Sequence, residues 1–158
     1  MTAVNELLSR LIRPVRLLCV EDDTSFALML QRTLQTRYVC TVDNAVTGEE
    51  ALEMVKRNRY DVVLLDLLLP GMSGVDVLRQ LKLLSKAIPV IVITGNLGTA
   101  LAEEAAHCGV VTFVEKPFET EDLDEIFGLF KIRARTTEDD AYLKSCASTP
   151  DYPYERPT

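Results

Sequence analysis

Two kinds of segment alternate along residues 15–132. Segments of the first kind are short, apolar and rich in β-branched residues, and they read VRLLCV, YVCTV, DVVLLD, PVIVIT and VVTFVE. Because their apolar residues run continuously rather than at every second position, we expect strands that are covered on both faces. Each is followed by a segment in which apolar residues recur every three or four positions, which predicts an amphipathic helix.

Several of the five helical segments have recognisable ends. The second opens with the capping box Thr47-x-x-Glu50, and the third follows a candidate N-cap at Ser73. The fourth begins near Gly98 and stops at Gly109. The apolar positions are, in chain order, Phe26, Leu30, Leu34, Ala51, Met54, Val55, Val77, Leu81, Leu84, Leu97, Leu101, Ala105, Leu123, Ile126, Phe127 and Phe130. Five repeats of strand and helix predict an α/β fold with a doubly wound parallel sheet and right-handed crossovers.

The two ends of the chain lack this alternation. Residues 1–14 form an amphipathic extension, which predicts a helix that packs on its own domain or makes a dimer contact. Residues 133–158 lose the apolar period, and the prolines of STPDYPYERPT oppose both helix and sheet. We therefore expect one domain over residues 15–132, followed by a flexible tail or a truncated linker.

Composition narrows the setting. The chain has 17 Lys and Arg residues against 24 Asp and Glu residues, a net charge of −7, which is the wrong sign for binding nucleic acid or an anionic membrane. No apolar run approaches the roughly 18 residues of a membrane span. The four cysteines have no metal-binding or CxxC spacing, so we expect reduced thiols in a soluble cytoplasmic protein.

The carboxyl ends of the predicted strands carry polar residues, and ligands bind beyond this edge in such sheets. These residues are Glu21, Asp22 and Asp23 after the first strand, Asp66 after the third, Thr94 and Gly95 after the fourth, and Lys116 and Pro117 after the fifth. Asp66 lies inside the apolar run DVVLLDLLLPGMSG, and an ionised carboxylate in a core must be paired, metal-bound or neutralised.

Carboxylates held close together repel one another unless a cation intervenes. Mg²⁺ prefers oxygen ligands and takes one or two protein carboxylates, so Asp22 and Asp66 suffice, with Glu21 acting through water. An aspartate beside Mg²⁺ can attack phosphorus and form an acyl phosphate. In that chemistry Lys116 supplies a cation, Thr94 supplies a hydroxyl donor, and a glycine after Thr94 leaves room for the phosphoryl group.

At these residues the sequence resembles the response-regulator receiver domain of two-component signalling. The blocks LLCVEDD, DVVLLDLLLPGMSG, VIVITGN and TFVEKPF match the signature blocks of that family in order. The resemblance implies a flavodoxin-like (βα)5 fold with strand order 2-1-3-4-5. It also implies a phosphorelay protein that is not an enzyme beyond its own phosphorylation and dephosphorylation, with Asp66 phosphorylated by a histidine kinase or a histidine phosphotransfer protein.

The resemblance also implies roles for single residues. Mg²⁺ would be held by Asp22, Asp66 and the main-chain carbonyl of Leu68, with Glu21 acting through water, while Asp23 starts a helix. Thr94 and Phe113 would form the switch, and the Lys116–Pro117 peptide bond would be cis. The output surface would comprise the fourth helix, the fifth strand and the fifth helix of the repeat, where a homodimer or a partner protein would bind.

Two alternatives remain open. A haloacid-dehalogenase-like phosphatase uses similar groups, but its turnover depends on a second acid two residues after the nucleophile, where this chain has Leu68. A receiver-shaped interaction module that is never phosphorylated is the other alternative. His107, the single histidine, is expected to face solvent and not to donate a phosphoryl group.

Overall fold

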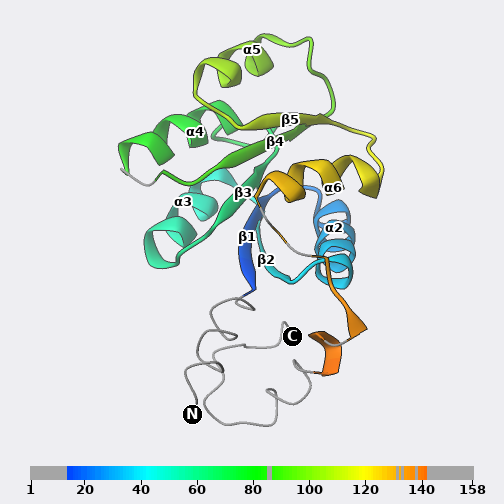
Figure 1. Cartoon of the computed structure of the whole chain (residues 1–158). Coiled ribbons are helices and arrows are strands. Elements are labelled where there is room, and N and C mark those ends of the chain that lie inside the picture. Colours follow the sequence, from blue (N-terminus) through cyan, green and yellow to red (C-terminus); the bar gives the residue numbers. More distant parts are fainter. Residues whose placement is uncertain (1–13, 85–86, 131, 133, 138, 142–158) are drawn as a thin grey trace.

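The computed structural model describes residues 14–84, 87–130, 132, 134–137 and 139–141 (Figure 1). Its elements are β1 (Val15–Val20), α2 (Thr24–Arg37), β2 (Cys40–Ala45), α3 (Gly48–Arg57), β3 (Val62–Leu65), α4 (Gly74–Leu83), β4 (Val90–Thr94), α5 (Ala100–His107), β5 (Thr112–Glu115) and α6 (Thr120–Leu129). All neighbouring strands pair in parallel, in the order β2-β1-β3-β4-β5. The predicted α/β fold and strand order are confirmed. The fourth and fifth helices of the repeat are α5 and α6.

Helices cover both faces of the sheet (Figure 1). On one face α3, α4 and α5 pack on alternate residues of the strands, such as Leu18 and Leu65. On the other face α2 and α6 pack on the intervening residues, such as Leu17 and Leu64. The central strands are therefore buried on both sides, which explains the continuous apolar runs in the sequence.

Local signals in the sequence set most helix starts. Thr47 and Ser73 accept hydrogen bonds from backbone N–H groups of α3 and α4, as predicted. The fourth helix starts later than expected, because Thr99 caps α5 and leaves Leu97 in the preceding loop, where its side chain is exposed. Strand β2 extends past the predicted apolar run to Ala45, because it pairs with β1 along its whole length.

Part of the chain after α6 lies against the C-terminal end of α2. Ile132 is buried, and Ala134 forms an antiparallel bridge with Tyr38. Arg135 donates from its backbone N–H to the carbonyl oxygen of Arg37 at 2.8 Å. These contacts belong to the segment for which the sequence predicts a tail or linker. The expected N-terminal helix in residues 1–13 and the rest of the tail, residues 142–158, lie outside the described residues.

The described cysteines are free thiols, and two of them are buried. Burial raises the pKa of both Cys19 and Cys40 to about 12, so these thiols stay protonated at neutral pH. Cys146 lies outside the described residues. Among the described helices, none is both long and apolar enough to span a membrane.

Candidate functional site

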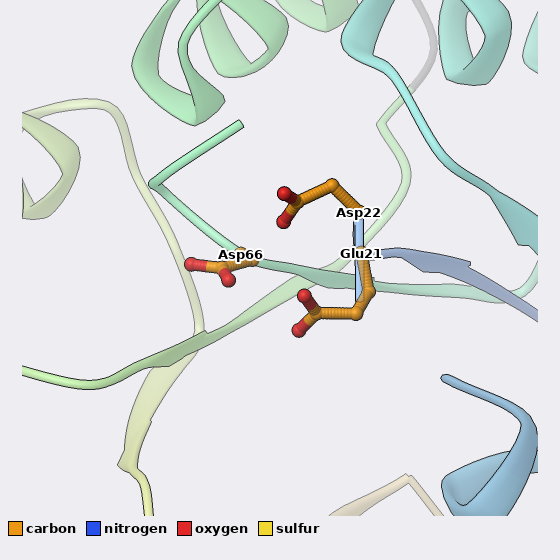
Figure 2. Close-up of side chains that lie close together, drawn as sticks. All are labelled: Glu21, Asp22 and Asp66. Carbon is orange, nitrogen blue, oxygen red and sulfur yellow. The ribbon is translucent and has the colours of Figure 1, made fainter. Parts of the chain in front are cut away.

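Three carboxylates meet at the carboxyl ends of the two central strands. Glu21 and Asp22 follow β1, Asp66 follows β3, and all three side chains point toward the same side of the strand ends (Figure 2). One oxygen of each lies within 4.8 Å of the others. The backbone holds them there because pairing continues one residue past each strand, from Glu21 N–H to Ala45 O and from Asp66 N–H to Val20 O, both at 3.0 Å. The predicted convergence of these acids is confirmed.

The carboxylates differ in their exposure to water. Glu21 and Asp66 are only 3% and 8% exposed, whereas Asp22 is exposed. Burial raises the pKa of Glu21 above its ordinary value, although hydrogen bonds from Lys116 and from the Asp23 backbone act in the opposite direction. Burial of these charges therefore has to be compensated within the site.

Lys116 provides the compensation. Its Nζ lies 2.5 Å from Glu21 Oε2 and 3.1 Å from Asp66 Oδ2. These contacts agree with the prediction that the lysine and the acids lie together at the strand ends. The Lys116 backbone N–H donates to Thr94 O at 2.8 Å, and the Lys116–Pro117 peptide bond is cis, the form that the resemblance implies. Burial acts to lower the pKa of Lys116, but the hydrogen bond to Glu21 and the two carboxylate charges raise it overall. One ammonium thus faces three carboxylates, and the cluster stays negative when all are ionised.

Thr94, Gly95 and Leu68 lie at the same edge of the sheet as Asp66. Thr94 ends β4 and is 2% exposed. A Cβ on Gly95 would meet nothing within 4 Å, so there is open space beside this glycine, and its use by a phosphoryl group stays a prediction. Leu68 donates from its backbone N–H to Asp66 Oδ1 at 3.0 Å, while its side chain is 63% exposed. The main chain of Leu68 is therefore near Asp66, and its carbonyl as a metal ligand stays a prediction.

Other predicted residues have clear places. Asp23 caps α2 by accepting a hydrogen bond from the Phe26 N–H at 3.0 Å, so its expected position at a helix start is confirmed. His107 is exposed at the end of α5, as predicted. Phe113 lies on β5, half-buried against the core that α3, α4 and α5 cover, a position compatible with a core role and with a switch role.

Sequence reasoning missed one contact of the site. The Lys116 Nζ lies over the ring of Phe26, 4.4 Å from its centroid. The sequence marks Phe26 only as an apolar position of a helix, because helical spacing says nothing about contacts with a distant loop. A signal could have come from its place in the first turn after the acidic residues, which aims it toward the strand ends.

The chain thus has a parallel five-stranded α/β sheet with three acids and one lysine at its carboxyl edge. The family model of the response regulator receiver domain matches residues 17–127. The chain therefore belongs to the response regulator receiver domain family of two-component systems.

The curated proteins that are similar to this chain include response regulators. The chain is 34% identical over 139 residues to the response regulator MprA of Mycolicibacterium vanbaalenii, an alignment that covers 86% of this chain and 58% of the relative. It is 35% identical over 124 residues to the transcriptional regulatory protein DltR of Streptococcus agalactiae, covering 78% and 53%. The chain thus spans about half the length of the curated relatives it matches.

Solved structures share the fold. The chemotaxis protein CheY4 of Vibrio cholerae is 27% identical with a TM-score of 0.67, covering 73% of this chain and 97% of that one. The response regulator TrrA of Thermotoga maritima, solved in complex with Mg²⁺ and BeF, is 28% identical with a TM-score of 0.65, covering 72% and 96%.

Proposed function

We propose that Asp66 is the phosphoacceptor of this receiver and that it takes its phosphoryl group from a histidine kinase or a histidine phosphotransfer protein in a Mg²⁺-dependent step. The observation that carries the proposal is the meeting of Asp66 with two further acids and one lysine at the edge of the sheet. These groups suit such a transfer, because the acids can hold Mg²⁺ and Lys116 supplies a second cation to neutralise charge on the phosphoryl oxygens.

The residues fit Mg²⁺ chemically. Hard carboxylate oxygens outnumber the one ammonium, and Asp22 is open to water, which Mg²⁺ retains in its coordination shell. Asp22, Asp66 and the main-chain carbonyl of Leu68 would hold the ion, and Glu21 would act through water. When bound, the ion would neutralise charge on the phosphoryl oxygens.

Asp66, Lys116 and Thr94 have different roles in the transfer of the phosphoryl group. An Asp66 carboxylate oxygen attacks phosphorus, the new P–O bond forms, and the bond from phosphorus to the histidine nitrogen of the donor breaks with its electron pair staying on nitrogen. Lys116, which already bonds Asp66, then donates to a phosphoryl oxygen, and the hydroxyl of Thr94 donates to another.

Leu68 bears on how long the phosphorylated state lasts. Hydrolysis of the acyl phosphate needs a water positioned in line, and the apolar side chain of Leu68 offers no hydrogen bond to hold one. The presence of leucine, and not an acid, two residues after Asp66 supports a long-lived signal rather than phosphatase turnover. The phosphatase alternative is therefore disfavoured.

The proposed output surface is formed by α5, β5 and α6. Drawing the Thr94 hydroxyl toward a phosphoryl group would vacate space that the half-buried ring of Phe113, on the neighbouring strand, can fill. A second copy of this chain or a partner protein would then read the surface. The cytoplasmic location and the lack of nucleic-acid or membrane binding by this chain alone stay predictions.

Beryllium fluoride, a phosphoryl mimic, tests this function by NMR. With Mg²⁺ present, we expect amide shifts to change around Asp66 and also across residues 97–118, and Thr94→Ala to remove the distant changes. Beryllium fluoride without Mg²⁺ is the control. Changes confined to the loops around Asp66, or a distant response that survives Thr94→Ala, would contradict the switch. No response at all would favour the interaction module that is never phosphorylated.

A further inference from the structure

Lys116 has an aromatic neighbour as well as its two carboxylate partners. The ring of Phe26, from the first turn of α2, lies under the ammonium, with 4.4 Å between Nζ and the ring centroid. A cation within about 6 Å of a ring face is attracted by the negative face of the π-system. The ammonium is therefore held from two directions, by Glu21 and Asp66 on one side and by the Phe26 ring on another.

Phe26 is itself held in place. Its ring meets the ring of Phe118 edge to face, with centroids 6.0 Å apart and an angle of 86° between the planes. Its backbone N–H donates to the Asp23 side chain, which fixes the start of α2. Both rings pack against the core that α2 and α6 cover. Phe26 thus links the start of α2 to the loop that carries Lys116.

The ring of Phe26 also forms part of the apolar surface below the carboxylates. Phe26 lines a small pocket together with Cys19, Leu30 and Ile93, directly beside Glu21 and Asp66. Side chains of this kind offer the Lys116 ammonium no hydrogen bond. An ammonium that leaves the carboxylates can therefore turn to water or stay on the ring, and the ring favours the position beside Asp66.

We infer that Phe26 is a positioning residue that keeps the Lys116 ammonium beside Asp66 when a phosphoryl group takes up the carboxylate oxygen to which Lys116 now bonds. Lys116 has a flexible four-carbon stem, and when Asp66 Oδ2 is replaced its ammonium keeps only Glu21 as a carboxylate partner. The Phe26 ring then supplies the second contact that fixes its direction. With the ring beneath it, the ammonium passes from Asp66 Oδ2 to a phosphoryl oxygen with little movement. This inference rests on the proposed phosphoacceptor function.

Three variants test the inference. Phe26→Leu removes the π-face but keeps an apolar side chain, Phe26→Tyr keeps the ring, and Phe130→Leu makes the same change elsewhere on the core that α2 and α6 cover. The first readout is independent of phosphorylation and uses the NMR signals of the Lys116 Hε protons, which a ring below them shifts upfield. We expect Phe26→Leu to move these signals to the position of an ordinary lysine, and the other two variants to leave them upfield. Unchanged signals in Phe26→Leu would overturn the contact.

The second readout is the initial rate at which a small acyl phosphate labels the protein in Mg²⁺. We expect Phe26→Leu to slow labelling about 3- to 10-fold, and Phe26→Tyr and Phe130→Leu to label at nearly the wild-type rate. In a Lys116→Ala background, Phe26→Leu should cause no further loss. An equal loss with and without Lys116 would show that Phe26 acts on the fold and not through the ammonium, and would overturn the inference. If wild-type protein took no label, the proposed function would fail, while the Hε signals would still decide the contact.

Discussion

Two groups of charged side chains lie at opposite ends of α2, and they differ in how deeply their charges are buried. Near its start, Lys116 pairs with Glu21 and Asp66, and Asp22 lies close to these two acids. At its end, Arg37 binds Asp124 of α6 through two nitrogens, with Nε at 3.1 Å and an Nη at 2.6 Å from the carboxylate oxygens. We call the first group the site cluster and the second, with the Tyr38 hydroxyl that donates to Asp124, the α2–α6 clasp.

One carboxyl in each group has a shifted pKa, and the two shifts have opposite directions. In the α2–α6 clasp, the hydrogen bond from Arg37 lowers the pKa of Asp124. In the site cluster, burial raises the pKa of Glu21. The clasp ties two helices together through Arg37, which pairs with Asp124 and, at 3.8 Å, with Glu121, and all three side chains are at least 39% exposed. The site cluster also has more acids than bases, but its Glu21 and Asp66 side chains are buried. This difference teaches that excess negative charge marks a place for a cation where water does not screen it.

The largest expected effect comes from Gly74, which lies against the backbone of the site cluster. A Cβ at this position would stand 2.5 Å from Asp66 O and 2.6 Å from Leu67 Cα. We expect Gly74→Ala to lower the free energy of unfolding by about 1–3 kcal/mol and to weaken Mg²⁺ binding, because Asp66 has to move. Urea unfolding and calorimetry measure both. Gly95→Ala, which meets nothing, is the control for stability. Wild-type stability and affinity in Gly74→Ala would mean that the carboxylate positions are not constrained.

The next largest expected effect is the stabilisation of the folded protein by Mg²⁺, which should depend on the site cluster and not on the clasp. At ten times its Kd, an ion that binds only the folded state stabilises it by about 1.4 kcal/mol. We expect this gain in thermal unfolding of the wild type, a smaller gain in Asp22→Asn, and an undiminished gain in Asp124→Asn. An equal gain in Asp22→Asn and the wild type would place the ion elsewhere.

Removal of one hydroxyl group tests the α2–α6 clasp. Tyr38→Phe loses the hydrogen bond to Asp124 but keeps the ring that contacts Phe127, so we expect a loss of about 1 kcal/mol in unfolding free energy. The Mg²⁺ affinity should stay that of the wild type. A change in that affinity would show that the two groups are coupled and would break the comparison.

The smallest effect is the pH dependence of stability in the absence of metal. Because the folded-state pKa of Glu21 is raised, its ionisation opposes folding, and stability falls as pH rises above the ordinary value of 4.5. Glu21→Gln should therefore be slightly more stable than the wild type at pH 7 and should lose this advantage below pH 4.5.

Asp124 has the opposite sign. Its folded-state pKa is lowered, so its contribution is present above the ordinary value of 3.8 and is lost as pH falls through the lowered pKa. Asp124→Asn should be less stable than the wild type at pH 7, and the difference should shrink in acid. Unfolding midpoints in a chelator from pH 3 to 7 measure both variants, and slopes of the same sign would contradict the assignment.

Much of the site could be predicted from the sequence because parallel strands bring their carboxyl ends to one edge. This rule alone gathers Glu21, Asp66 and Lys116 from distant parts of the chain. The strand order could not be worked out from periodicity and came from the family resemblance. The contact of Phe26 with Lys116 depends on how a helix start and a loop pack together, which no local pattern encodes.

The α2–α6 clasp was missed for a related reason. Charges on exposed helix faces have no period that separates a bidentate pair from solvated residues, so Arg37 and Asp124 carry no signal in the sequence. The contacts of Ala134 and Arg135 with the end of α2 were also missed, because the loss of apolar period after the last helix hides a segment that docks through its backbone.

Mass spectrometry after incubation with a small acyl phosphate tests the central claim most directly. We expect wild-type protein to gain one phosphoryl group when Mg²⁺ is present and none in a chelator, and Asp66→Asn to gain none in either condition. The Asp124→Asn variant, changed in the clasp, should be labelled like the wild type. Labelling of Asp66→Asn at the wild-type rate, or labelling of the wild type without metal, would contradict the account.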